Sequence, residues 1–352
     1  MMPEERPAAE NSVELSRVQQ PSLSRARRGR LATVRRDFFL DHSERLTEQE
    51  RALMTTMLNR LVGDVAAALR AVLPASWAGT NYDDDYRLVE RLTNAGLLDE
   101  EALLALLLRR AEEEDVAIAA RSRADRRELR AIQGLVSHDN GPAAASAMAL
   151  VLARGRRRDT LGQCLLTFDD VPPPAARQLA RRVGAALRSD LIATHGPVAV
   201  DEALVQAAAE VAESNDPERS LDALTGELVA LLDSGGFLDD RLLLAAAAEG
   251  EIAFLAHAFA RRSGMDSAVA AEELLSRNPA RVMALLRISG TERDFAAALI
   301  AASGNLLAID CDGRGLEHFD GLTAADVDLE RALLLADDDY RTALDRLEDN
   351  RG

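Results

Sequence analysis

The chain contains no lysine, so all 42 of its basic residues are arginine. A protein without lysine cannot form a Schiff base through a side-chain amine, and it lacks the lysine of a phosphate-binding loop. Its two cysteines, Cys164 and Cys311, have no CxxC spacing and predict neither a disulfide framework nor a zinc site. Aromatic residues make up only 3% of the chain. We therefore expect a core of Leu, Ala and Val in closely packed helices.

Long hydrophobic runs are also missing. Apolar stretches such as 102–108 and 242–248 are too short to span a bilayer, and the N-terminus has acidic residues and no apolar signal segment. The sequence thus predicts a cytoplasmic protein that does not associate with membranes.

Acidic residues concentrate in the second part of the chain. Residues 201–352 contain 31 Asp and Glu against 13 Arg, while the whole chain has a net charge of −17. Because an acidic surface repels phosphate backbones, nucleic acid could bind only the N-terminal part, where Arg25–Arg36 is rich in arginine.

An internal duplication predicts the architecture. Residues 87–104 (RLVERLTNAGLLDEEALL) return 140 positions later as 227–244 (ELVALLDSGGFLDDRLLL), with identical residues at eight of eighteen positions. Such a helix–turn–helix unit cannot bury its apolar face alone, so copies of it must stack. No window alternates apolar and polar residues between hairpin turns. We therefore predict an all-α fold of irregular HEAT-like repeats, an α-solenoid of right-handed stacked helix pairs without a sheet.

Helix start and stop signals divide the chain into segments. Thr47–Glu50 is a capping box that opens a helix to about residue 73, Gly96 suits a left-handed helix end, and Asp99 is placed to cap the next helix. Further helices are predicted at 124–137, 142–154, 160–168, 173–194, 198–213, 217–234, 240–249, 251–262, 266–277, 279–288, 291–302, 323–336 and 339–348. The predicted organisation is a disordered tail (1–22), an N-terminal helical region (23–80), two halves of a repeat array (81–215 and 216–302), an irregular glycine-rich loop (303–322) and C-terminal capping helices (323–352).

Catalytic motifs are not evident. The sequence has neither a HExxH zinc-protease motif nor a GxSxG nucleophile elbow, and we predict no cofactor. Residues Cys311, Asp312, His318 and Asp320 are of metal-ligand type, which leaves a metal-dependent enzyme using loop 303–322 as one alternative.

Arginine placement is the most suggestive polar signal. Arg177, Arg181 and Arg188 fall on one stripe of a predicted helix, and a second cluster precedes it at Arg154, Arg156, Arg157 and Arg158. If the two clusters converged, they would form an anion site for phosphate or for an acidic segment of a partner. Candidate acidic contacts in the second half are Asp239, Asp240, Glu272 and Glu273.

Four segments together form a recognisable pattern: the capped helix 46–73 and the stretches VAIAARSRADRRELRAIQGLVSHDNGPAAASAM (116–148), VPPPAARQLARRVGAALRSDLI (171–192) and LLLAAAAEGEIAFLAHAFARRSGMDSAVAAEELL (242–275). This pattern resembles an uncharacterised alphaproteobacterial family, catalogued only as a domain of unknown function and described as HEAT-like helical-repeat proteins. The resemblance covers most of residues 45–300. It implies an all-helical repeat scaffold and supplies no catalytic residue.

We therefore expect a non-enzymatic, regulatory scaffold whose curved surface binds a protein or peptide partner. The principal alternative is binding of nucleic acid or a phosphate ligand through the arginine clusters of the N-terminal half. The sequence leaves the oligomeric state open.

Overall fold

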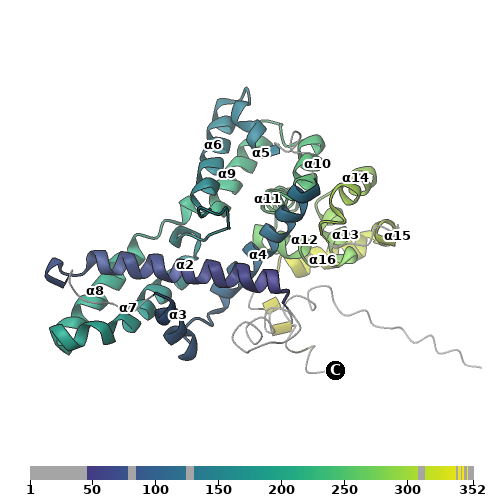
Figure 1. The fold of residues 1–352 in the computed structure, drawn as a ribbon. Helices are drawn as coiled ribbons and strands as arrows, with labels where there is room; N and C mark the ends of the chain where they lie inside the picture. The colour runs from purple at the N-terminus through teal and green to yellow at the C-terminus, as the bar shows by residue number, and fades with distance from the viewer. Residues whose placement is uncertain are drawn as a thin grey trace, which may run out of the picture.

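The computed structural model describes residues 46–77, 85–123, 131–307 and 314–337, together with positions 340, 341, 343, 344 and 347. The regular structure of these residues is entirely helical, which confirms the all-α prediction, and a single isolated bridge joins Arg158 to Cys164 (Figure 1). Within these ranges, no helix combines the length and the apolar character needed to cross a bilayer.

The α-helices follow one another with short connections. In chain order they are α2 (Glu48–Val72), α3 (Asp85–Asn94), α4 (Glu101–Arg123), α5 (Ala131–Gly134), α6 (Gly141–Arg156), α7 (Pro173–His195), α8 (Pro197–Glu213), α9 (Leu221–Ser234), α10 (Asp240–Ala248), α11 (Ile252–Ser263), α12 (Ser267–Leu274), α13 (Pro279–Ile288), α14 (Arg293–Ser303), α15 (Arg314–Gly321) and α16 (Ala324–Leu334). The 3-10 turns are η1 (Ala75–Trp77), η2 (Leu135–Ser137), η3 (Phe168–Asp170) and η4 (Pro217–Arg219).

The helices pack around two hydrophobic cores. One core unites α2, α3, α7 and α8 with the first half of α4, and the other unites α5, α6 and α9 to α16 with the second half of α4. In Figure 1, α5, α6 and α9 rise as an arm above α2, α10 to α16 lie to the right of this arm, and α3, α7 and α8 lie below α2. Helix α4 belongs to both cores, since it buries Leu103 and Leu107 in the first and Val116 in the second.

Helix α2 begins as its capping box predicts. The Thr47 hydroxyl accepts the Glu50 N–H at 3.1 Å, and the Glu50 carboxylate accepts the Thr47 N–H at 3.0 Å. Its buried positions, among them Met54, Leu58 and Leu61, recur at three- and four-residue steps. The helix therefore buries one continuous stripe in the first core.

The duplicated unit ends its first helix in both copies with the same turn. The N–H of Leu97 reaches the carbonyl of Leu92 at 2.9 Å, and the N–H of Phe237 reaches that of Leu232 at 2.8 Å. This bond closes a Schellman motif, whose glycine adopts a left-handed conformation. The same turn ends α3, α9, α10 and α13, at Gly96 (φ 64°), Gly236 (φ 72°), Gly250 (φ 69°) and Gly290 (φ 70°). The left-handed conformation predicted at Gly96 is thus confirmed.

Three sequence predictions are wrong in detail. Residues 160–168 do not form an α-helix, because the backbone folds back on itself instead: the N–H of Asp159 donates to the carbonyl of Gln163 (3.1 Å) and the N–H of Leu165 to that of Arg157 (2.9 Å), around the Arg158–Cys164 bridge. The helix predicted over 217–234 is interrupted at Ser220, where η4 ends and α9 starts. The cap predicted at Asp99 is supplied instead by Glu100, whose carboxylate accepts the Leu103 N–H at 2.9 Å.

The loop predicted at 303–322 is also partly helical. Residues Arg314–Gly321 form α15, which buries Phe319 against the second core. This burial outweighs the low helix propensity of its two glycines. Residues 1–45, which include the predicted tail and the arginine-rich segment, lie outside the described residues, as do 124–130, 308–313 and much of 339–348.

The turn between α10 and α11 approaches α4 closely at Gly250. A Cβ added there would lie 3.0 Å from the carbonyl oxygen of Val116, whereas one added at Gly96 would meet nothing within 4 Å. Both glycines have positive φ. Only Gly250 therefore combines backbone strain with a steric conflict.

We expect Gly96→Ala to lower the free energy of unfolding by about 1 kcal/mol, from backbone strain alone. Gly250→Ala should lower it by about 2–3 kcal/mol, because overpacking against α4 adds to the strain. Urea unfolding followed by circular dichroism measures both values. Equal losses in the two variants would contradict the close approach of this turn to α4.

Candidate functional site

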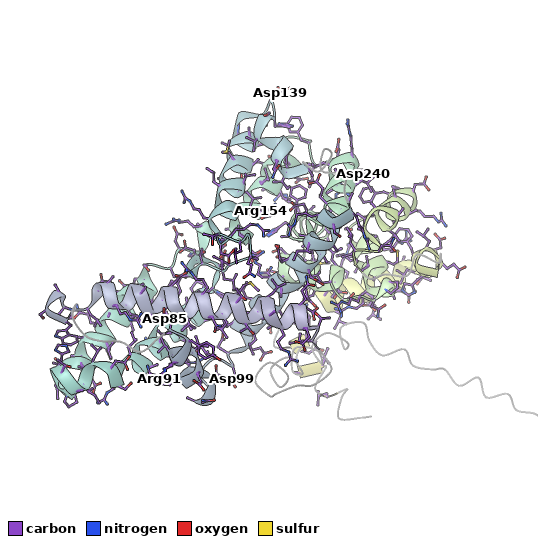
Figure 2. The ribbon with its side chains drawn as sticks, viewed as in Figure 1. Asp85, Arg91, Asp99, Asp139, Arg154 and Asp240 are labelled. Carbon is purple, nitrogen blue, oxygen red and sulfur yellow. The ribbon has the colours of Figure 1, made fainter. Side chains whose placement is uncertain are left out.

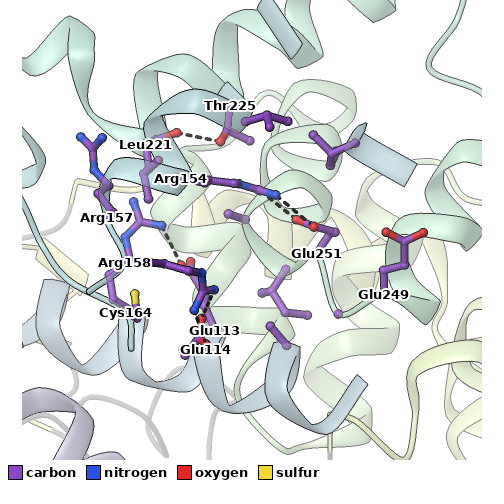
Figure 3. Close-up of a pocket in the computed structure, with 18 of the residues that line it drawn as sticks. Glu113, Glu114, Arg154, Arg157, Arg158, Cys164, Leu221, Thr225, Glu249 and Glu251 are labelled. Atoms are coloured by element: carbon purple, nitrogen blue, oxygen red, sulfur yellow. Dashed lines mark hydrogen bonds and ion pairs between the residues drawn. The ribbon is translucent and has the colours of Figure 1, made fainter. Parts of the chain in front are cut away.

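A cavity of about 550 Å³ opens where α4 passes between the arm and α11 (Figure 3). We call it the central cleft. Its wall includes apolar side chains, among them Val151 of α6 and Leu221 of α9. Its charged lining comes from α4, the end of α6 and the turn before α11, and consists of Arg110, Glu113, Glu114, Arg121, Arg154, Arg157, Arg158, Glu249 and Glu251.

The arginines at the end of α6 are held by carboxylates from distant parts of the chain. The Nη2 atom of Arg154 lies 2.8 Å from Oε2 of Glu251. Arg158 binds Glu114 with two hydrogen bonds, of 3.0 and 2.9 Å, and Arg121 contacts the same carboxylate at 2.6 Å. Arg154 and Arg158 therefore each have a carboxylate partner within the cleft (Figure 3).

Arg157 forms a buried ion pair that holds the local structure together. Its guanidinium is buried and donates to the Asp170 carboxylate from Nε at 2.7 Å and from Nη2 at 3.0 Å. Nη2 also donates to the carbonyl of Arg219 at 2.9 Å. Asp170 additionally accepts the N–H groups of Thr167 and Leu221, each at 2.9 Å. This pair thus joins the end of α6 to η3 and to the start of α9.

The charges of this pair also set the pKa of Asp170. Burial alone would raise the pKa of this carboxyl, but the hydrogen bonds and the charge of Arg157 outweigh burial and lower it. The folded state therefore favours the ionised carboxylate. The resulting stabilisation is complete above the pKa of the unfolded state and is lost as the pH falls through the folded-state pKa.

A second charged cluster extends from the α4 wall of the cleft. The buried Arg110 donates to Asp222 at 2.9 Å and to Glu113 at 2.7 Å, and Arg109 also binds Asp222. Burial alone would raise the pKa of Asp222, yet Arg110 and Arg109 hold it well below its usual range. These ion pairs fasten the start of α9 to α4.

The remaining predicted site residues lie elsewhere. Arg156 is exposed beyond the cleft, and Arg177 and Arg181 are exposed on α7, where Arg188 pairs with Asp201. None of the α7 arginines lines the central cleft, so the two arginine clusters do not form a common site there.

The acidic candidates are also dispersed. Asp239 caps α10, and Asp240 lies 3.5 Å from Arg262 (Figure 2). Glu273 is buried against Arg281, which donates to it from Nε at 2.8 Å. Glu272 lines a second cavity, of about 640 Å³, between α4, α12 and the end of α16. These four residues therefore do not gather on one common surface.

The metal-ligand set of the loop can be placed only in part. The Nε–H of Arg293 is shared between the two carboxylate oxygens of Asp320, at 2.8 and 2.9 Å, and His318 lies on the same helix as Asp320, α15. Cys311 and Asp312 lie outside the described residues. Among the residues that the structure describes, no group of three or more His, Cys, Asp or Glu is arranged to hold a metal ion.

Sequence reasoning missed the acidic half of the cleft. Glu113 and Glu114 belong to a glutamate run that interrupts the apolar spacing of α4 two positions after Arg110. Such a run beside two arginines inside an otherwise apolar helix is a signal that could have marked the site. Glu251 carries no comparable signal, because only the fold brings it to Arg154.

The family comparison covers the whole of this cleft. A family model described as "Uncharacterised protein conserved in bacteria (DUF2336)" matches residues 91–331, more than half of the chain. The chain belongs to this family. The matched span runs from within α3 to within α16. A search of curated proteins and a search of solved structures each found no match.

We expect Asp170→Asn to lower the free energy of unfolding at pH 7 by about 3–5 kcal/mol, because it leaves the Arg157 charge buried without its counter-charge. Between about pH 5 and pH 3 the wild type should lose stability faster than the variant, because only the wild type must protonate this carboxylate. Urea unfolding across this pH range is the measurement. The exposed Asp240→Asn is the control and should change stability by less than about 0.5 kcal/mol. Parallel pH profiles of wild type and Asp170→Asn would refute this role.

Cys164 is a poor nucleophile at neutral pH. Its burial, and secondly the charge of Glu114, raise the pKa of the thiol to about 11. In the Cys311→Ser chain, the rate of Cys164 alkylation by iodoacetamide should still rise about tenfold between pH 9 and pH 10. The urea-unfolded chain, whose thiol has a pKa of about 8.5, should already level off there. Identical pH profiles for the folded and the unfolded chain would disprove the raised pKa.

Proposed function

We propose that this chain is a non-enzymatic regulatory scaffold that binds a protein or peptide partner, and that its helices form an irregular HEAT-like repeat. The recurring Schellman turn supports the repeat, because one local device ends α3, α9, α10 and α13. Contacts between helices that are close in the chain, such as α10 with α11, α11 with α12 and α12 with α13, support it as well.

The central cleft is the observation that carries the proposed binding function. It offers charges of both signs around partly buried apolar side chains such as Val151 and Leu221. A peptide also carries charged side chains of both signs beside apolar ones. Its charged groups can take the place of Arg154 or Glu251 in the ion pair that these two residues form. Its apolar side chains can cover the wall between these charges.

A phosphate ligand fits this cleft less well. It would have to displace Glu251 from Arg154 and Glu114 from Arg158, and the displaced carboxylates would repel it. Arg157 is buried and already bound to Asp170. The same ion pairs disfavour docking of a nucleic-acid backbone here, so we favour a protein or peptide partner.

The test is an affinity pull-down from the native cell with the full chain, read out by mass spectrometry. Ala117 of α4 lines the cleft and forms no side-chain ion pair, so Ala117→Trp should fill the cleft without disturbing its charges. We expect this variant to weaken recovery of a specific partner about tenfold, equivalent to about 1.4 kcal/mol.

The matched control is Ala209→Trp, an exposed position on α8 outside the cleft, which should leave recovery unchanged. Equal recovery by both variants would exclude the cleft as the binding site. Material that disappears after nuclease treatment would instead favour the nucleic-acid alternative.

A further inference from the structure

Helix α6 presents an apolar face to solvent. Its inner side buries Ala143, Ala147 and Leu150, and α6 packs on α5, η2 and α9. On its outer side Met148 is 43% exposed and Leu152 is 55% exposed. Between Gly141 and Ala153 the helix contains no charged residue. Figure 1 shows α6 at the outer edge of the arm, so this face is accessible.

Helix α8 is also at the surface, but its outward side carries polar residues. On α8 the exposed apolar residues Val198 and Val205 are interspersed with exposed Asp201, Glu202 and Gln206. A surface helix ordinarily carries such polar residues on its outer face. An outer face without them indicates a surface that another apolar surface covers.

The shape of the α6 face is complementary to itself. Its exposed positions are symmetric about the point between Met148 and Ala149. If two copies of α6 pack antiparallel about that point, each long side chain lies opposite a small residue: Met148 opposite Ala149, Leu152 opposite Ala145, and Arg156 opposite Gly141. Alternation of large and small residues allows two helices to interdigitate at close range.

The charges at the two ends of α6 also favour antiparallel packing. Asp139 lies just before α6, at the tip of the arm, and Arg156 lies at its last turn (Figure 2). Both are exposed, and neither forms an ion pair within the described part of the chain. Antiparallel packing brings Arg156 of each copy to Asp139 of the other, whereas parallel packing would place like charges together. The antiparallel helix dipoles also favour this arrangement.

We propose that two copies of this chain form a symmetric dimer through the outer face of α6, packed antiparallel about the point between Met148 and Ala149. A two-fold axis makes such an interface from one surface used twice. Because one helix pair covers less than the about 1,600 Å² of a standard interface, the dissociation constant is expected in the micromolar range.

Sedimentation equilibrium of the full chain over a concentration series measures this constant directly. Leu152→Glu should raise it at least about tenfold, since the symmetric interface loses the contact twice and gains two buried charges. Val205→Glu introduces the same charge at an exposed apolar position of α8 and should leave the dimer unchanged. Circular dichroism establishes that both variants fold.

Charge reversal tests the orientation. Arg156→Glu and Asp139→Arg should each weaken self-association, because each creates two like-charge contacts in the homodimer. An equimolar mixture of these two variants should recover dimerisation, because both end contacts are then complementary. Dimerisation in the mixture, but in neither variant by itself, would support the antiparallel pairing.

A concentration of about 100 µM is well above a micromolar dissociation constant, so a chain that stays monomeric there would overturn the proposal. This holds whatever else covers the α6 face, including residues 1–45 or another protein. A dimer that tolerates Leu152→Glu would overturn it as well. The measurement requires no other component of the cell, so its outcome is independent of the pull-down that tests the central cleft.

Discussion

The arrangement of the arm depends on the buried pair of Arg157 and Asp170. One carboxylate accepts hydrogen bonds from the guanidinium and from the N–H groups of Thr167 and Leu221. It therefore fixes where α6 ends, where η3 lies and where α9 begins. Because α6 and α9 also form one wall of the central cleft, the geometry of that wall follows from this pair.

The sequence predicted features that are set within a few residues. The capping box at Thr47, the proline after Asn278 and the left-handed Gly96 all act through neighbouring backbone groups, and the helices they delimit were placed correctly. The interruption at Ser220 could not be predicted in this way. There, Asp170 and Arg157 bind backbone groups of Leu221 and Arg219, some fifty to sixty residues away.

The candidate site was predictable only in the part of its basic lining that comes from the end of α6. Arg154, Arg157 and Arg158 lie close together in sequence and are visible as a cluster, but Glu251 is 97 residues from Arg154 and Glu114 is 44 residues from Arg158. These arginine–carboxylate pairs also show what arginine provides in this chain that lysine could not. A guanidinium can bind a carboxylate through two parallel N–H groups, as Arg157 and Arg158 do, and an ammonium group cannot.

Helix α4 has a mechanical consequence. It is one uninterrupted rod of 23 residues that is embedded in both cores, and its middle turns carry Glu113 and Glu114 into the cleft. The two cores are thus joined by a stiff element as well as by loops, and a rotation of one core against the other would require this rod to bend or to leave one of them. Because Glu113 and Glu114 project from the same rod, such a rotation would also displace the acidic half of the cleft.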